Sequence, residues 1–293
     1  MAKAVSFVHT IPVRYQDCDA YGIVNAVSYL HFMLEATMAH MAADGLTYKR
    51  WMSGGIAWVI RNTEIEFLRP LRYGDTVDVS VKVGNLRRAS VSRFYELYIQ
   101  GSGDLAARAR SKFAVASLET KRPVPIPEDM ILAFFPDGTC EENRPRRRFP
   151  KAPPAPSEVL QWRTKVEWRD LDAQRHVSNA TYLGYMQMAV LDQNERIGWP
   201  IQRILERNQG GVIQWTHVLY QGQALIGDEV EVTSFFSDLG TSSCIRHDVV
   251  TRASDGSTLA RGHTRWVWMD LATLKPVPIP ADYLAPLSTY FVK

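Results

Sequence analysis

The apolar and polar positions along the chain predict a long helix followed by several strands. Residues 26–43 carry apolar side chains at helical spacing over much of the circumference, which indicates a helix buried against other elements. Glycine at position 45 suits the left-handed residue that often follows a helix. Alternating patterns typical of β-strands come after the helix, at residues 63–68, 76–83, 90–99 and 107–118.

The same order of elements occurs twice. When Asp17 is placed on Asp170, the chain aligns with itself without a gap as far as Asp282. Residues 123–127 then fall on residues 276–280, and both segments read Pro-Val-Pro-Ile-Pro. A match of this length indicates one domain that was duplicated and fused.

Each copy is expected to begin with a short strand that leads into a polar turn before the helix. The first strand is predicted to end near Tyr15, and its counterpart in the second copy near Trp168. Asp17 and Asp170 then lie at the ends of these strands and are expected to shape the turns.

The predicted domains are residues 1–133 and 158–293, joined by a proline-rich linker at residues 134–157. The linker contains the basic run Arg144–Arg148, which we expect to be a solvated charge cluster rather than an anion site. One helix followed by long antiparallel strands predicts an α+β fold in which a sheet curls around a central helix. Exposed sheet edges of the two copies would pair, giving an intramolecular pseudo-dimer.

Composition and charge narrow the functional classes. Of the 293 residues, 46% are hydrophobic and 22% charged, and the formal net charge is +3. These values exclude a disordered chain, a collagen-like fibre and a supercharged nucleic-acid binder. No apolar stretch approaches the ~18–20 residues of a membrane span. With three scattered cysteines and no secretory signal at the N-terminus, the sequence favours a reducing cytoplasm.

Two motifs before the helices carry a family resemblance. Residues 17–24, Asp-Cys-Asp-Ala-Tyr-Gly-Ile-Val, followed by Tyr29-Leu30, resemble the front motif of hotdog thioesterases of the hydroxybenzoyl-CoA type. Residues 170–183 are similar to the catalytic half of acyl-ACP thioesterases, whose pattern is Asp-Leu-Asp-x-Asn-x-His-Val-Asn-Asn. The resemblance implies a double hotdog, in which each sheet wraps a helix and active sites lie where copies pair.

Thioester hydrolysis needs donors for the carbonyl oxygen and a group that delivers the nucleophile. The first backbone N–H groups of a helix are free and carry the positive end of its dipole. They are therefore suited to an oxyanion. The family match assigns this role to the N–H groups of Ala26 and Asn179.

The resemblance assigns the carboxylate role to Asp19 and Asp172, as a nucleophile or as a general base that activates water. The alternative is that these residues only cap the turn or the helix, as Asp often does. The sequence leaves open which copy is active.

The copies differ beyond this aspartate. The second has Gln174 and His176 at the family's Asn and His positions, whereas the first has Tyr21 and Ile23. His176 is expected either to polarise the carbonyl and orient water, or to serve the loop structurally. The family's acidic residue on a later strand aligns approximately with the neutral Gln223, which is a departure from the family pattern.

Three more side chains are candidates. Glu35 lies in the apolar helix and is either a second catalytic acid or a residue at the pocket rim. Arg87 and Arg88 match a basic segment near the nucleotide end of CoA in the hydroxybenzoyl-CoA type, and arginine suits phosphate. The alternative for this pair is a solvated hairpin.

The sequence thus predicts a double-hotdog thioesterase that hydrolyses an acyl-CoA or acyl-ACP thioester. No metal or cofactor is expected, because no P-loop, dinucleotide motif or metal-spaced histidine cluster is present. No nucleic-acid partner is expected, and the chain is predicted to form a homo-oligomer, a dimer of pseudo-dimers. The alternatives are a non-catalytic acyl- or CoA-binding protein and, less favoured, a hotdog dehydratase.

Overall fold

The computed structural model describes residues 6–136, 140, 144–145 and 148–292. The chain forms two compact units, Met1–Arg148 and Phe149–Lys293. Arg146 and Arg147 of the predicted basic run lie outside the described residues. The linker predicted at residues 134–157 contains the point at which the two units divide.

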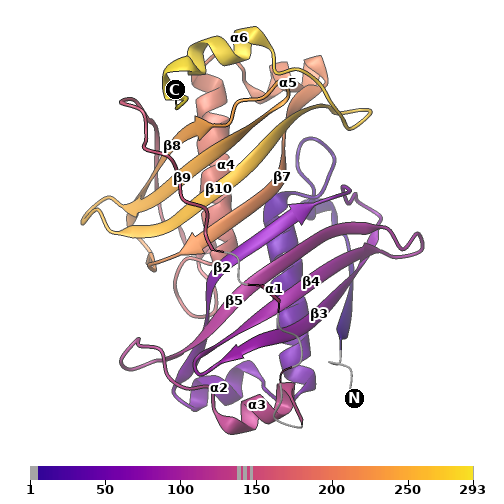
Figure 1. The fold of residues 1–293 in the computed structure, drawn as a ribbon, viewed down its shortest axis with the longest axis vertical. Coiled ribbons are helices and arrows are strands. Elements are labelled where there is room, and N and C mark those ends of the chain that lie inside the picture. Colours follow the sequence, from indigo (N-terminus) through magenta and orange to yellow (C-terminus); the bar gives the residue numbers. More distant parts are fainter. Residues whose placement is uncertain (1–5, 137–139, 141–143, 146–147, 293) are drawn as a thin grey trace. The chain divides into compact units, whose positions relative to one another are not determined.

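The first unit is an antiparallel sheet with a long helix against one face (Figure 1). Its strands are ordered β1-β3-β4-β5-β2. The helices and strands are β1 Phe7–Pro12, α1 Ala26–Ala43, α2 Tyr48–Ser53, β2 Ile56–Phe67, β3 Thr76–Arg87, β4 Ser90–Ile99, β5 Leu105–Ser117 and α3 Glu128–Phe134.

The second unit repeats this arrangement, with α4 as the long helix and the strand order β6-β8-β9-β10-β7. The elements are β6 Leu160–Lys165, α4 Asn179–Arg196, α5 Ile201–Arg207, β7 Gln209–Tyr220, β8 Glu229–Ser237, β9 Ser243–Arg252, β10 Thr258–Asp270, β11 Lys275–Pro276 and α6 Ala281–Leu284. The duplicated helix-on-sheet fold is therefore confirmed, and the pairing of the copies stays a prediction.

The long helix of the first unit coincides with its predicted range. Its N-cap is Asn25, whose Oδ1 accepts a hydrogen bond of 2.9 Å from the N–H of Val27. The helix is followed by Gly45, which has a φ of +71° and supplies the left-handed conformation expected there. Phe32, Met33 and Ala36 are buried, whereas an exposed stripe of the helix includes Leu34 and Glu35.

The predicted ends of the first strands were wrong. β1 ends at Pro12 and β6 at Lys165, while Tyr15 and Trp168 begin short 3-10 turns, Tyr15–Asp17 and Trp168–Asp170. The aspartate that ends each turn explains the difference, because its carboxylate accepts the backbone N–H three residues earlier and closes the turn. Within the described residues, no helix combines the length and apolar character needed to cross a membrane.

Candidate active site

The turn before the long helix has the same backbone in both copies. The N–H of Asp19 donates to the carbonyl of Ile23 over 2.9 Å, and the N–H of Asp172 donates to the carbonyl of His176 over 3.0 Å. Gly22 has a φ of +70° in the first turn, and Arg175 takes the same place with a φ of +65°. The second copy thus accepts the backbone strain that glycine avoids in the first.

The two aspartates hold these turns. Oδ1 of Asp19 accepts the N–H of Tyr21 over 2.9 Å, and Oδ1 of Asp172 accepts the N–H of Gln174 over 2.8 Å. The structural role that the sequence left as an alternative is therefore present, although the helices are capped by other residues. Burial raises the pKa of Asp19, although the backbone hydrogen bonds that its carboxylate accepts act to lower it. Burial and the Asp19 charge raise the pKa of Tyr21 to about 12.

The second turn brings an imidazole to its aspartate. Nδ1 of His176 lies 3.8 Å from Oδ2 of Asp172 and 3.2 Å from the carbonyl oxygen of Val177. Both neighbours are acceptors, so we assign the imidazole proton to Nδ1. Nε2 is then the bare acceptor, and this buried atom has no hydrogen-bond partner among the described residues. Ile23 occupies the position of His176 in the first copy.

Free amides mark both helix starts. Ser178 caps α4, with Oγ accepting the N–H of Thr181 over 3.2 Å. In the part of the chain that is described, the N–H groups of Ala26 and Asn179 meet no acceptor. These are the two donors that the family match selects, and they point where a helix binds negative charge.

Asp17 and Asp170 are held by different partners. The Arg14 guanidinium lies 2.8 Å from Asp17, and its hydrogen bonds outweigh the effect of burial to hold the pKa of that carboxyl below its usual range. In the second copy, where Glu167 replaces Arg14, the hydroxyl of Tyr185 donates to Asp170 over 2.9 Å. Both aspartates therefore have structural partners, as expected of residues that shape the turn.

A loop between β7 and β8 backs the second turn. The N–H of Val177 donates to the carbonyl of Ala224 over 2.9 Å, and the N–H of Ala224 donates to the hydroxyl of Tyr182 over 3.0 Å. Tyr29 and Leu71 make the same tyrosine contact in the first copy, over 3.1 Å. Sequence analysis included Tyr29 and Tyr182 in the family motifs without giving them a role, although a buried tyrosine next to a turn commonly hydrogen-bonds through its hydroxyl.

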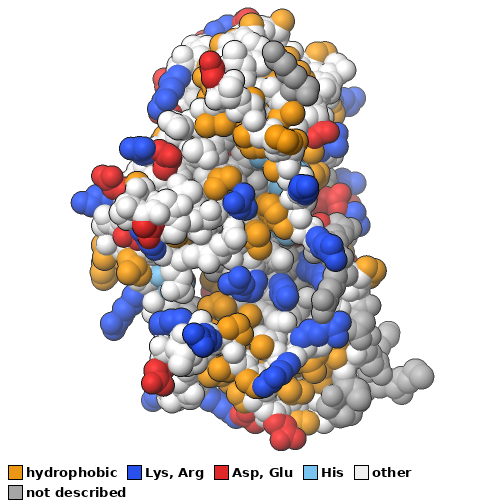
Figure 2. Space-filling view, turned by 60° about the vertical axis from the view of Figure 1, so that its left-hand side comes forward, with side chains coloured by type: hydrophobic (Ala, Val, Ile, Leu, Met, Phe, Trp, Pro, Cys, Tyr) orange, Lys and Arg blue, Asp and Glu red, His pale blue; other side chains and the backbone are white. Residues whose placement is uncertain are grey.

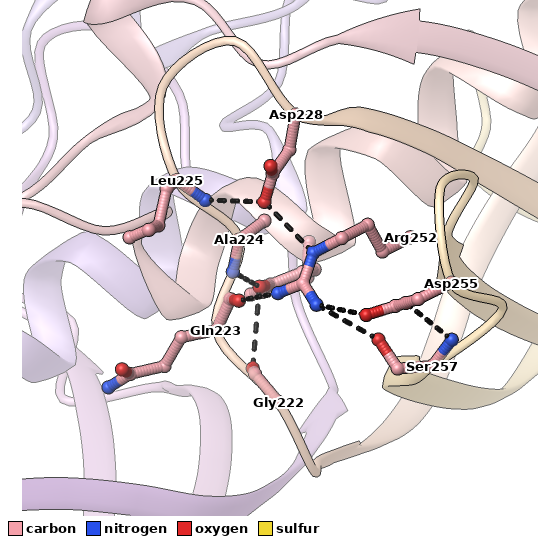
Figure 3. A network of polar contacts seen from close by, with 9 residues as sticks. Gly222, Gln223, Ala224, Leu225, Asp228, Arg252, Asp255 and Ser257 are labelled. Atoms are coloured by element: carbon pink, nitrogen blue, oxygen red, sulfur yellow. Dashed lines mark hydrogen bonds and ion pairs between the residues drawn. The ribbon is translucent and has the colours of Figure 1, made fainter.

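Gln223, which stands at the family's acidic position, lies in the same loop. Its side chain is exposed, and Figure 3 shows it directed away from the guanidinium of Arg252, which instead binds the Gln223 carbonyl. The second turn therefore brings His176 to Asp172 and leads directly into α4, which begins with the free amide of Asn179. The side chain of Gln223 lies outside the network that supports this turn.

The remaining candidates are exposed side chains. Glu35 lies on α1, where its charge acts on Arg14, the partner of Asp17. Arg87 ends β3, and the exposed Arg88 follows it, whereas the first turn is hydrogen-bonded through Leu71 to the loop before β3. A strand of this length spans about 35 Å, so the two arginines lie far from the turn of their own copy. Figure 2 shows Lys and Arg side chains interspersed with hydrophobic ones on one face.

The site chemistry is that of carboxylate, imidazole and backbone amides. Among the described residues, no group of three or more His, Cys, Asp or Glu side chains is placed to hold a metal ion. The arrangement leaves two groups without partners among the described residues, the buried Nε2 of His176 and the N–H of Asn179.

Comparison with known proteins points to one family. The sequence model of the thioesterase-like superfamily matches residues 13–134 and 166–287, one match for each copy. A chloroplastic acyl-ACP hydrolase from Cuphea viscosissima is 22% identical over 89% of this chain, and the chain spans 62% of that relative's length. A 1,4-dihydroxy-2-naphthoyl-CoA hydrolase from Thermosynechococcus vestitus is 31% identical over 40% of this chain and 81% of its own length.

A solved structure supports the fold. A protein described as an oleoyl thioesterase from Lactobacillus plantarum has a TM-score of 0.78, with 18% sequence identity, and the likeness covers 95% of this chain and 99% of that one. The double-hotdog architecture is shared over nearly the whole chain.

Proposed function

Because the chain belongs to the thioesterase-like superfamily, we propose that it hydrolyses an acyl thioester at the turn that precedes α4. One observation carries this choice of copy: His176 lies beside Asp172 in the turn that leads into the unpaired amide of Asn179. The first copy has an aspartate and a free amide, but Ile23 offers no proton acceptor.

The mechanism follows from where the protons lie. The thioester carbonyl oxygen accepts a hydrogen bond from the N–H of Asn179, which also stabilises the oxyanion of the tetrahedral intermediate. Nε2 of His176 is buried in the free protein, so the mechanism requires that substrate binding admit a water molecule beside it. That water gives its proton to Nε2 as its oxygen attacks the carbonyl carbon. The nearby charge of Asp172 stabilises the imidazolium that forms. Collapse of the intermediate breaks the C–S bond, and the imidazolium returns the proton to the leaving sulfur, releasing acid and thiol.

An alternative within the same turn is that Asp172 itself attacks or activates water, because the family supports both roles. Gln174 lies beside it and is proposed to contact the acyl group through its side-chain amide. The substrate class is an acyl ester of CoA or of an acyl carrier protein, since the named relatives act on one or the other.

A second candidate function is binding of an acyl or CoA group without turnover. The observation that favours it is the exposed, neutral Gln223 at the family's acidic position. A binding protein would retain the amide donors of Ala26 and Asn179 and would show ligand-induced stabilisation without thiol release.

Thiol release from short, long and aromatic acyl-CoA esters and from acyl carrier protein esters tests the proposal. We expect Asp172→Asn and His176→Ala each to lower kcat by about a hundredfold or more, the usual size of general-base effects. Asp19→Asn is the matching change in the first copy, and it should retain the rate of thiol release if the turn before α4 is the active one. Loss of activity in Asp19→Asn with full activity in Asp172→Asn would contradict the choice of copy. Absence of turnover on every ester, with binding retained, would favour the binding function.

A further inference from the structure

Arg252, the last residue of β9, is the centre of a polar network in the second unit (Figure 3). Its Nε donates to Oδ2 of Asp228 over 3.0 Å, and Nη1 donates to Oδ2 of Asp255 over 2.8 Å and to Oγ of Ser257 over 3.1 Å. Its Nη2 donates to the carbonyl oxygen of Gln223 over 2.6 Å. All three guanidinium nitrogens are therefore engaged, and one of them binds the carbonyl of the Gln223 peptide.

The peptide that Arg252 holds is adjacent to the one that supports the candidate active site. Gln223 precedes Ala224, whose carbonyl accepts the N–H of Val177, the residue after His176. Val177 is buried, and its hydrogen bond links the second turn to the loop between β7 and β8. A displacement of the Gln223 peptide therefore moves the backbone on which His176 is carried.

The first copy holds its loop with arginines at other positions. Ile99 stands at the position of Arg252 and has no polar side chain. Arg72, which lies in the loop itself, donates from Nη1 to the carbonyl of Gly22 in the first turn over 3.3 Å. The second copy has Leu225 at the position of Arg72. Arg69, in the same loop, also pairs with Asp104 over 3.5 Å. The two copies therefore tie their loops to neighbouring segments through arginines at unmatched positions.

From this arrangement we infer that Arg252 is a positioning residue for the second turn, acting through the Gln223 and Ala224 peptides on His176. It does not touch the substrate. Its contribution is to hold Nε2 of His176 at the distance and angle that proton transfer from water requires. Small displacements of a catalytic group can lower a rate by about a hundredfold without loss of binding. The expected change in kcat rests on the proposed function, whereas the expected effect on the backbone of the second turn does not.

The test compares Arg252→Ile, which copies the residue of the first copy, with Arg252→Lys and with the control Arg163→Ile. Arg163 is an exposed residue of β6 that pairs with Glu231 of β8 in the same unit. We expect Arg252→Ile to lower kcat by about ten- to a hundredfold with KM changed less than about twofold. Lysine should retain part of the rate because it keeps a charge near Asp228. Arg163→Ile should leave both constants unchanged.

Hydrogen exchange of the backbone amides provides a readout that does not depend on activity. In Arg252→Ile, the amide of Val177 should exchange faster, while amides in the centre of β9 keep their wild-type protection. Unchanged exchange at Val177, or an equal fall in kcat in Arg163→Ile, would overturn the inference. If the wild type hydrolyses no ester, the proposed function fails, and the exchange of Val177 still decides the role of Arg252.

Discussion

Arg93 and His40 form a buried hydrogen bond in the first unit. In the second unit, Gln193 takes the place of His40. Nη1 of Arg93 lies 3.2 Å from Nδ1 of His40, and Nε2 of His40 lies 3.4 Å from Asp44. In the second unit, Nη1 of Arg246 donates to Oε1 of Gln193 over 3.0 Å. An arginine N–H requires an acceptor, so His40 must be neutral with its proton on Nε2.

This relationship predicts an acid-sensitive first unit. Burial, together with the Arg93 charge, lowers the pKa of His40 to about 4. Since the pKa is 6.5 in the unfolded chain, the unfolded state binds the extra proton and stability falls as pH drops from 6.5 towards 4. The contribution of His40 between pH 7 and pH 4.5 is about 2–3 kcal/mol. Urea unfolding at the two pH values should show a smaller difference for His40→Gln than for the wild type.

The reciprocal change provides the control for this experiment. Gln193→His places an imidazole beside Arg246 and should add acid sensitivity to the second unit. The interpretation would be wrong if the free energy of unfolding of His40→Gln depended on pH as strongly as that of the wild type. It would also be wrong if each variant shifted that free energy by the same amount at neutral and at acidic pH.

Removal of the Tyr185 hydroxyl should destabilise the second unit. Asp170 would lose a donor at 2.9 Å, and hydrogen bonds to charged groups contribute about 1.5–3 kcal/mol. The matching position of the first copy is Phe32, which shows that the ring alone fits. Tyr185→Phe should therefore lower the free energy of unfolding measured in urea, while Tyr15→Phe, at an exposed tyrosine, should not. Equal stabilities of Tyr185→Phe and wild type would contradict the assignment.

Gly262 permits α4 to lie close to β10. A Cβ at this position would stand 2.6 Å from Sδ of Met186 and 3.3 Å from Cβ of Asp248. Gly262→Ala should cost about 1–3 kcal/mol through overpacking, measured by denaturant unfolding. Adding Met186→Ala should relieve part of that cost, because the two changes share one contact. Additive losses in the double variant would show that the clash is not the cause.

Gln223→Ala should change kcat by less than about twofold, because the side chain is exposed and makes no contact in the network of Figure 3. Thiol release is the measurement, with Tm as the check on folding. A tenfold loss would show that the amide of Gln223 acts in the reaction and that the structural separation is misleading.

The sequence was a good guide to elements with strong periodicity. The range of α1 was predicted to the residue because an apolar helical pattern ends before Gly45, and β4 was predicted equally well from its alternation. The end of β1 was misplaced because Asp17 folds the chain back through its carboxylate, a contact that no periodicity records. Side-chain to backbone turns of this kind depend on conformation rather than on residue pattern.

The candidate site was predictable in part for the same reason. Asp172 and His176 belong to a short contiguous motif, so their proximity follows from one turn of backbone. Arg252 was missed because its key contact is a main-chain carbonyl at Gln223, which the sequence does not distinguish from any other. The buried hydrogen bond of His40 was missed because residues far apart in sequence meet there.

The unmatched arginines at positions 72 and 252 have a consequence for how this protein can change. In an assembly of identical subunits, every mutation enters each active turn at once, so an improvement at one turn must be tolerated at the other. A fused pair has separate codons for its two turns, and here the two loops are held by arginines at different positions. Mutations, natural or engineered, can therefore change or inactivate one turn while the structure of the other turn stays the same.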